Sequence, residues 1–248
     1  MNFFNRLWYF IRREAWFHIA RIRKIPNTAR NWSAFWADYQ QYVSGASGDE
    51  EIVLQPLIDD RTSQTPIEPI YYYQDAWAFE RIYANQPAKH IDVGSNNKFV
   101  SLLSKVVPTT MVDIRPLSLR LESLDFVEGS ILELPFEDES CESISSICVV
   151  EHIGLGRYGD PIDHGGTVKA LKELVRVLAP GGRLCISVPI DDTDKTFFNG
   201  QRAFTEATIL KMCEPLVLTD KAYIFGREFL TSPKKGYGTG CYEFEKAL

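Results

Sequence analysis

Short β-rich runs alternate with helical segments from residue 88 to residue 248, and this alternation limits the fold more than any other feature of the chain. Strands separated by helices form parallel sheets that are covered on both faces. The last two runs follow each other without a helix, which predicts an antiparallel pair at the sheet edge. The predicted strands lie at 89–93, 110–114, 126–128, 143–149, 183–188, 216–224 and 241–245, and the predicted helices near 97–106, 116–123, 165–178 and 204–213. The pattern therefore predicts an α/β fold with a seven-stranded, mostly parallel sheet.

Residues 1–65 have a different pattern, which predicts an α-helical N-terminal extension before a main domain at 66–248. Apolar residues recur at helical spacing and predict a helix at 2–25. This stripe consists of Phe4, Trp8, Ile11, Ala15, Ile19 and Ile22. A second helix is predicted at 29–43, beyond Pro26, and the segments 44–48 and 56–69 have the composition of linkers.

Charge is unevenly distributed along the chain. Residues 1–30 carry seven Lys and Arg against one Glu, whereas the whole chain has a net charge of −6. A basic helix rich in aromatic residues is typical of peripheral membrane helices, which suggests a membrane contact through residues 2–25. The alternative is a helix that packs on the main domain or on a partner.

The chain's acidity argues against a nucleic-acid partner. No window approaches the ~18 apolar residues of a membrane span, and the early apolar run at 7–11 is too short for a signal-peptide core. These features predict a cytoplasmic protein, and the basic helix predicts its association with a membrane surface.

The ends of the first two strands carry the residues that indicate a ligand. In open parallel sheets, ligands bind beyond the carboxyl ends of the strands. The first strand ends at Asp92 and Gly94, where glycine lets a ligand approach the backbone, and the second ends at Asp113, an acid suited to the two hydroxyls of a ribose. The alternative is an ordinary tight turn between a strand and a helix.

The loop after the first strand distinguishes between nucleotide classes. A dinucleotide site uses G-x-G-x-x-G to make room for a pyrophosphate. Here Gly94 is followed by Ser95 and Asn96, so the loop holds a single glycine. This pattern favours a nucleoside without phosphate, and S-adenosylmethionine is the obvious candidate.

Four stretches resemble class I S-adenosylmethionine-dependent methyltransferases: HIDVGS at 90–95, LPFEDES at 134–140, SICVVEHI at 146–153 and LVRVLAPGGRL at 174–184. The last two resemble small-molecule methyltransferases of the quinone-biosynthesis type. The sequence GLGRYGDP at 154–161 resembles a largely uncharacterised methyltransferase-like subfamily. YQDAW at 73–77 and FNGQR at 198–202 resemble its other motifs. That subfamily is associated with the modification of glycans and surface polysaccharides.

The resemblance implies a Rossmann-like fold that binds S-adenosylmethionine. The first-strand residues would hold the methionine end, the second-strand acid the ribose, and the residues after it and after the third strand the adenine. The implied cofactor-binding residues are Asp92, Gly94, Ser95, Asp113, Ile114, Ser130, Ile131 and Val149. Asn96 departs from the family's G-x-G, which puts cofactor affinity in question.

Methyl transfer mainly requires alignment of the acceptor with the methyl group, but a hydroxyl acceptor must also lose a proton. His152 is the predicted base, with Glu151 orienting it or lining the cofactor site. His164 is a second candidate. The alternatives are a structural hydrogen bond for His152 and a loop position for His164.

Five residues near the same rim are predicted to bind the acceptor: Arg157, Tyr158, Asp160, Asn199 and Arg202. Two arginines facing one pocket suit a carboxylate, a phosphate or a sugar phosphate. The alternative is that Arg157 and Asp160 form an ion pair within the loop.

No metal is predicted. Related enzymes with Glu-x-x-Glu-His after the fourth strand can hold a divalent cation, but Cys148 replaces the first Glu here, and a thiolate is a poor ligand for Mg²⁺. Three acids at 191–194 resemble the metal motif of glycosyltransferases, although such short runs are usually solvated loops.

Together these features predict methyl transfer from S-adenosylmethionine to a small molecule or glycan precursor, with a sugar hydroxyl favoured. The rival hypothesis is a methyltransferase fold with weak or no cofactor binding that serves as a scaffold or regulator in glycan assembly. The acceptor's identity and the oligomeric state are not predicted.

Overall fold

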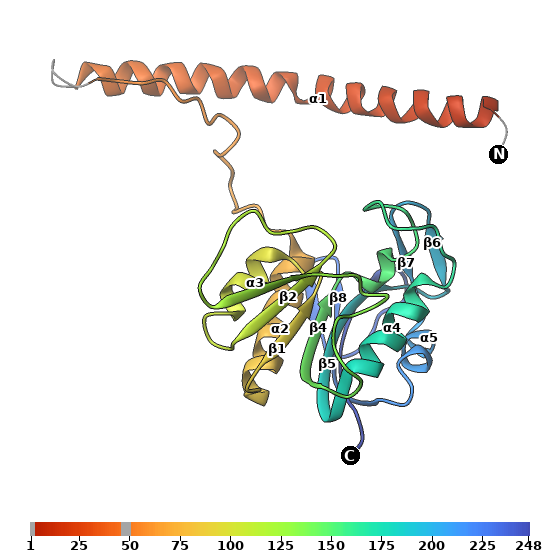
Figure 1. Ribbon diagram of the computed structural model, residues 1–248. Coiled ribbons are helices and arrows are strands. Elements are labelled where there is room, and N and C mark those ends of the chain that lie inside the picture. The colour runs from red at the N-terminus through yellow and green to blue at the C-terminus, as the bar shows by residue number, and fades with distance from the viewer. Residues whose placement is uncertain (1–2, 46–50) are drawn as a thin grey trace. The chain divides into compact units, whose positions relative to one another are not determined.

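The computed structural model describes residues 3–45 and 51–248 and divides the chain into two compact units, residues 1–66 and 67–248 (Figure 1). The first unit contains one long helix and an extended segment. The second contains a sheet with helices.

The first unit is dominated by α1 (Phe3–Ser44), which corrects the prediction of two helices separated at Pro26. A proline removes one backbone hydrogen bond from a helix, and α1 continues on both sides of that position. Three members of the predicted apolar stripe, Phe4, Trp8 and Ile11, are more than half exposed. Among the residues described, no helix is both long enough and apolar enough to cross a bilayer.

The second unit is built on an eight-stranded sheet of order β3-β2-β1-β4-β5-β10-β8-β9. The strands are β1 (His90–Val93), β2 (Thr109–Asp113), β3 (Leu124–Glu128), β4 (Cys141–Ile147), β5 (Leu178–Ile190), β8 (Val217–Phe225), β9 (Glu228–Leu230) and β10 (Gly238–Glu245). Strands β1 to β5 pair with one another in parallel, and the pairings that involve β8, β9 and β10, including that of β10 with β5, are antiparallel. The prediction of seven strands was therefore one short. The additional strand β9 spans only three residues, too few to show a period of two in the sequence.

Helices cover both faces of the sheet, as predicted. They are α2 (Pro69–Asn85), α3 (Asn97–Leu103), α4 (Gly166–Val177), α5 (Glu206–Met212) and the short 3₁₀ helix η1 (Val150–His152). A hairpin of β6 (Lys195–Phe197) and β7 (Gln201–Ala203) forms a separate two-stranded sheet. The helix predicted at 116–123 is absent from this described segment. Its leucines at 117, 119 and 121 alternate with polar residues, so a helix there would have no single apolar face.

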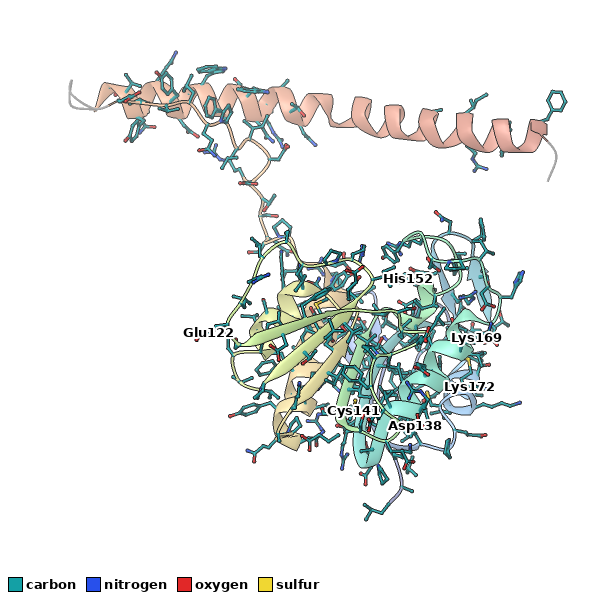
Figure 2. The ribbon with its side chains drawn as sticks, viewed as in Figure 1. Glu122, Asp138, Cys141, His152, Lys169 and Lys172 are labelled. Carbon is teal, nitrogen blue, oxygen red and sulfur yellow. The ribbon has the colours of Figure 1, made fainter. Side chains whose placement is uncertain are left out.

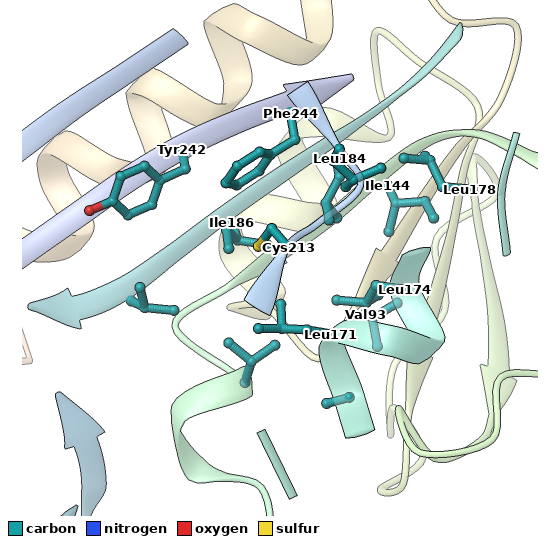
Figure 3. Packing of buried hydrophobic residues seen from close by; sticks show 14 of the residues in the cluster. Val93, Ile144, Leu171, Leu174, Leu178, Leu184, Ile186, Cys213, Tyr242 and Phe244 are labelled. Atoms are coloured by element: carbon teal, nitrogen blue, oxygen red, sulfur yellow. The ribbon is translucent and has the colours of Figure 1, made fainter. Parts of the chain in front are cut away.

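The core consists of two apolar clusters, one on each face of the sheet. Alternate residues of β5 separate between them. Leu184 and Ile186 pack with α4 and α5 on one face (Figure 3), and Cys185 packs with α2 and α3 on the other. This alternation is the normal consequence of side chains pointing to opposite faces along a strand.

Strand order reverses between β1 and β4, because the chain moves outward from β1 to β3 on one side and from β4 to β5 on the other. Such a reversal leaves a crevice at the carboxyl ends of the two strands. His152 lies at this end of β4, opposite Cys141 at its amino end (Figure 2). The fold therefore places the residues after β1, β2 and β4 at one edge.

Candidate functional site

Two cavities adjoin at the carboxyl ends of β1, β2 and β4. One is mostly apolar, with a volume of about 340 Å³, and the other is mostly polar, with a volume of about 580 Å³. The residues that line both are Gly94, Asp113, Arg115, Cys148, His152 and Tyr158. The predicted strand-end site and the observed cavities therefore lie in the same place.

The apolar cavity has the character of a site for a flat, largely apolar ring. Its lining includes Ile114 at the end of β2 and Ile131 after β3, both predicted to contact an adenine. Ser130 and Val149 line the same cavity, and the Ser130 hydroxyl accepts a hydrogen bond from the backbone N–H of Leu132 at 3.1 Å. The structure brings these four predicted residues together.

Asp113 lies where the two cavities meet. Its Oδ1 accepts hydrogen bonds from the backbone N–H of Arg115 at 2.8 Å and from Arg115 Nε at 3.3 Å. Arg115 Nη2 donates to Oδ2 at 3.4 Å. The Arg115 side chain is 60% exposed, so it can leave the carboxylate at small cost. The sequence analysis did not identify Arg115.

The loop after β1 needs a glycine at position 94, but the backbone at position 96 accepts any residue. Gly94 has a φ of +73°, and a Cβ there would lie 3.0 Å from Val149 Cγ1. Asn96 has a φ of −62°, and its side chain accepts a hydrogen bond from the backbone N–H of Lys98 at 2.9 Å. Because any residue adopts that φ, Asn96 caps the start of α3 without strain.

Asp92 supports the site from beneath. The carboxylate is fully buried and accepts hydrogen bonds from the backbone N–H of Ser95 at 3.1 Å and from the Ser145 hydroxyl at 2.6 Å. Burial raises the pKa of Asp92 to about 6 despite these donors. The expectation was that Asp92 would hold a ligand directly. Instead it holds the loop that carries Ser95, which itself lines the polar cavity.

His152 is held in one tautomer. Its Nδ1 lies 2.7 Å from the carbonyl oxygen of Gly200. A carbonyl oxygen only accepts, so Nδ1 carries the hydrogen and Nε2 keeps the lone pair. Arg157 Nη1 lies 3.2 Å and 3.4 Å from the two ring nitrogens and donates to the same carbonyl at 3.3 Å. Burial, opposed by the Gly200 hydrogen bond, lowers the pKa of His152 and keeps the ring neutral near pH 7.

Glu151 differs from the other acids of the site in its hydrogen bonding. Its carboxyl is 1% exposed, and its Oε2 has no hydrogen-bond partner among the residues that the structure describes. Oε1 lies 3.5 Å from His152 Nε2. Burial raises the pKa of Glu151 to about 8, so this carboxyl is mostly protonated at pH 7.

Asp160 organises the loop that follows β4. Its carboxylate accepts hydrogen bonds from the backbone N–H groups of Gly154 at 2.6 Å, Tyr158 at 3.3 Å and Gly156 at 3.4 Å. These bonds explain the acid in the sequence GLGRYGDP. Arg157 turns to His152 and Gly200 rather than to Asp160, so the ion pair considered from the sequence is replaced by other contacts.

Tyr158 connects the loops after β2 and β4. The guanidinium carbon of Arg115 lies 4.6 Å from its ring centroid and that of Arg157 lies 5.1 Å from it. The His152 ring meets Tyr158 edge-on at 5.8 Å. These cation–π contacts hold two cations in the lining of the polar cavity.

Four predicted site residues lie outside the two cavities that residues 67–248 form, namely Asp92, described above, and His164, Asn199 and Arg202. Arg202 is buried, and its guanidinium donates to the carbonyls of Ile153 and Asp163 at 2.6 and 3.1 Å and to the Thr167 hydroxyl at 3.1 Å. Asn199 and His164 are exposed. Arg202 therefore fastens the loop after β4, which corrects its predicted contact with an acceptor.

The polar cavity contains residues that the sequence analysis missed. They come from α2, β7 and the segment that leads into β10: Tyr71, Gln201, Tyr237 and Thr239. Two lie beside or within motifs noted in the sequence, YQDAW at 73–77 and FNGQR at 198–202. Gln74 of the first motif accepts hydrogen bonds from the Ser187 hydroxyl at 2.9 Å and from Cys148 Sγ at 3.1 Å. The motifs were the available signal.

The acids at 191–194 make structural contacts with residues of their own loop and of neighbouring segments. Asp191 pairs with Lys195 at 2.6 Å, Asp192 accepts from the backbone N–H of Gly236, and Asp194 accepts from the backbone N–H of Thr205. These contacts support the interpretation of the run as loop structure.

Residues 117–216 match the model of a family described as Caenorhabditis protein of unknown function, DUF268. No curated protein matches the chain.

Solved structures with similar folds include N-methyltransferase NodS from Bradyrhizobium japonicum WM9 in complex with S-adenosyl-L-homocysteine. It has a TM-score of 0.55 and 16% identity, over 78% of this chain and 92% of that one. Burkholderia thailandensis 1,6-didemethyltoxoflavin-N1-methyltransferase, with bound S-adenosylhomocysteine, has a TM-score of 0.54 and 17% identity over 71% and 79%. The [4+2]-cyclase SpnF has a TM-score of 0.52 and 12% identity over 70% and 82%.

Identities this low show the fold alone, and the cyclase shows that one fold can serve another reaction. The family match covers less than half of the chain. Over most of its length, the chain has the fold of class I S-adenosylmethionine-dependent methyltransferases.

Proposed function

We propose that the protein transfers a methyl group from S-adenosylmethionine to a small molecule or glycan precursor. The observation that supports this most strongly is Asp113, a carboxylate at the end of β2 with an apolar cavity on one side and a polar cavity on the other. An adenosine with a charged amino-acid tail has the same division into apolar and polar parts.

The residues present fit this cofactor. Ile114, Ile131 and Val149 would enclose the adenine, Asp113 would accept hydrogen bonds from the ribose hydroxyls once Arg115 leaves it, and the backbone at Gly94 leaves room for the chain beyond. When bound, the cofactor supplies an activated methyl group on a sulfonium. The unstrained cap at Asn96 removes the main reason to favour the scaffold hypothesis.

The polar cavity would hold the acceptor. Its wall carries the hydroxyls of Tyr71, Tyr237 and Thr239 and the amide of Gln201, which suits a ligand with several hydroxyls, such as a sugar. Arg157 on the same wall suits a carboxylate or phosphate. The acceptor's proton would leave toward Glu151 and His152. Assignment to glycan biosynthesis rests on the resemblance of the GLGRYGDP loop.

Transfer of label from methyl-labelled S-adenosylmethionine tests this function. We expect label to enter sugars or sugar phosphates incubated with the protein, and a His152→Ala variant to lose turnover while keeping affinity for S-adenosylhomocysteine within about threefold. A protein that binds the cofactor but labels none of a broad panel of hydroxyl acceptors would contradict the proposal.

We further propose that α1 contacts the cytoplasmic face of a membrane. The described side chains of its first half include exposed Phe4, Trp8 and Ile11, with the Arg12 guanidinium 5.2 Å from the Trp8 ring centroid. Exposed rings beside cations suit the headgroup region of anionic lipids. The full chain should sediment with vesicles containing phosphatidylserine, and a chain lacking residues 1–25 should not. Equal sedimentation of the two would refute this contact.

A further inference from the structure

The buried carboxyl of Glu151 lacks a hydrogen-bond partner, within the described part of the chain, on one of its two oxygens. Buried polar atoms in proteins nearly always have a hydrogen-bond partner, and Asp92 shows the normal case, with a donor on each oxygen. Glu151 is as deeply buried, but its Oε2 has no partner among the described residues. An arrangement of this kind indicates that a ligand supplies the missing interaction.

Glu151 is one of the residues that line the polar cavity. Gly94 and Ser95, next to the proposed methionine end, line the same cavity, and so do Gln201 and Tyr237 on the proposed acceptor wall. A carboxyl in this lining can therefore meet both a cofactor and an acceptor.

The titratable groups around Glu151 come from four elements. They are Tyr71 from α2, Cys148 after β4, His152 and Arg157 from η1 and the loop after it, and Tyr237 before β10. Arg157 is the cation within this group of residues, and it is exposed and lies against His152 and Tyr158. Arg157 already acts on this carboxyl as a positive charge, and a cationic ligand in the same cavity would add a second.

We propose that Glu151 is the counter-ion of the cofactor's sulfonium, ionised when the cavity holds S-adenosylmethionine and protonated when it holds S-adenosylhomocysteine. This inference rests on the proposed function. Burial disfavours a lone carboxylate, and an opposite charge nearby favours it. Burial raises the pKa of Glu151 to about 8, and a positive charge brought next to the carboxyl would lower it.

Ionised Glu151 is then the base for the acceptor. Its Oε2 takes the proton of the acceptor hydroxyl while the hydroxyl oxygen forms a bond to the methyl carbon. The carbon–sulfur bond breaks, and its electron pair stays on sulfur. The sulfonium and the carboxylate enter as opposite charges, and a thioether, a carboxylic acid and a methyl ether result, so atoms and charge balance. Solvent takes the proton from Glu151 before the next turnover.

Neutral His152 is the second proton acceptor beside Glu151. Its Nδ1 hydrogen is committed to the Gly200 carbonyl, and its Nε2 lies 3.5 Å from Glu151 Oε1 and 3.4 Å from Arg157 Nη1. Burial, opposed by the Gly200 hydrogen bond, lowers the pKa of His152, so the ring presents a lone pair and not a donor to Glu151.

Calorimetric titration in two buffers of different ionisation enthalpy tests the proposal at pH 7 without an acceptor. S-adenosylmethionine should release about 0.9 proton more than S-adenosylhomocysteine, the fraction that a carboxyl with a pKa of about 8 holds at pH 7. Protons from the amino group common to both ligands cancel in this difference. Glu151→Gln should abolish the difference and keep S-adenosylhomocysteine affinity. Glu137→Gln, at an exposed loop position, should leave it unchanged.

Each outcome decides one point. If neither ligand binds the folded protein, the proposed function fails. If both bind with equal proton release, or if the difference persists in Glu151→Gln, the counter-ion proposal is overturned. Should Glu151→Gln not fold, a pH series on the natural protein serves instead. The ratio of the two Kd values, methionine form over homocysteine form, should fall about ninefold from pH 6 to pH 7, and a constant ratio would overturn the proposal.

Discussion

The apolar and polar cavities adjoin at Asp113, yet they are built differently. The residues that line the apolar cavity all lie between positions 93 and 161, at or after the carboxyl ends of neighbouring parallel strands. The polar cavity adds side chains from distant parts of the chain, namely Tyr71 on α2, Gln201 on β7 and Tyr237 before β10. The comparison teaches that the proposed cofactor half depends on the common sheet, whereas the proposed acceptor half depends on features particular to this chain.

The two halves also differ in how their polar groups are satisfied. At the edge of the proposed cofactor half, Asp113 has hydrogen-bond donors on both oxygens. In the polar half, Glu151 is buried with one oxygen unpartnered among the described residues. Unsatisfied buried groups cost stability, and such costs concentrate at functional sites. A substitution that removes the carboxyl of Glu151 should therefore raise the free energy of unfolding.

The largest expected effect is on the pH dependence of stability. The pKa of Glu151 is about 8 in the folded protein, above its ordinary value. Between these two pKa values the folded state holds a proton that the unfolded chain has lost. The contribution of this proton to the free energy of unfolding falls as pH rises from about 4.5 to 8. The loss over this window is roughly 4 kcal/mol. The unfolding free energy of Glu151→Gln relative to the natural protein should thus rise from pH 5 to pH 8.

Chemical denaturation at several pH values measures this difference. Asp92, whose pKa is raised to about 6, titrates in both proteins and cancels. Glu137→Gln serves as the matched control and should show a flat difference. A flat difference for Glu151→Gln as well would mean that its carboxyl is not held protonated, and the contrast between the two halves would be lost.

The two arginines near the β4 loop should separate structure from binding. Arg202→Ala removes donors from the carbonyls of Ile153 and Asp163 and should cost roughly 2–4 kcal/mol of unfolding free energy. Arg157→Ala removes an exposed side chain and should change the unfolding free energy by no more than about 0.5 kcal/mol. The same substitution should weaken the binding of an anionic acceptor. Equal loss of stability in both variants would break this distinction.

The smallest expected effect is at the junction of the cavities. Arg115 donates to the carboxylate of Asp113 that the ribose would need. Because an exposed ion pair contributes about 0–1 kcal/mol, Arg115→Ala should strengthen S-adenosylhomocysteine binding by up to about fivefold in calorimetric titration. Weaker binding in the variant would instead assign Arg115 to the bound state of the site.

Residues predicted for the proposed cofactor half line one cavity for a physical reason. Parallel strands bring their carboxyl ends to one edge, so residues that follow consecutive strands, such as Gly94, Asp113 and Ile131, lie together whatever the details of the core. Alternation of strands and helices placed Gly94 and Asp113, and the resemblance to methyltransferases added Ile131.

The acceptor half could not be predicted in the same way. Tyr237 and Tyr71 reach the cavity only because β10 lies beside β5 and α2 packs on that face of the sheet, and no local period encodes these contacts. Arg202 was misassigned because an arginine near a rim has the same sequence pattern whether its guanidinium faces a cavity or, as here, buried carbonyls. Long-range packing decides between the two.

Titration of S-adenosylhomocysteine into the purified protein tests the central claim most directly. We expect micromolar binding by the natural chain and a loss of at least about 100-fold in Asp113→Ala, because two hydrogen bonds to a charged group disappear. Asp125→Ala, at an exposed position on the neighbouring strand β3, should bind as the natural protein does. A well-folded natural protein that gives no binding, or an Asp113→Ala variant that binds equally well, would contradict the account.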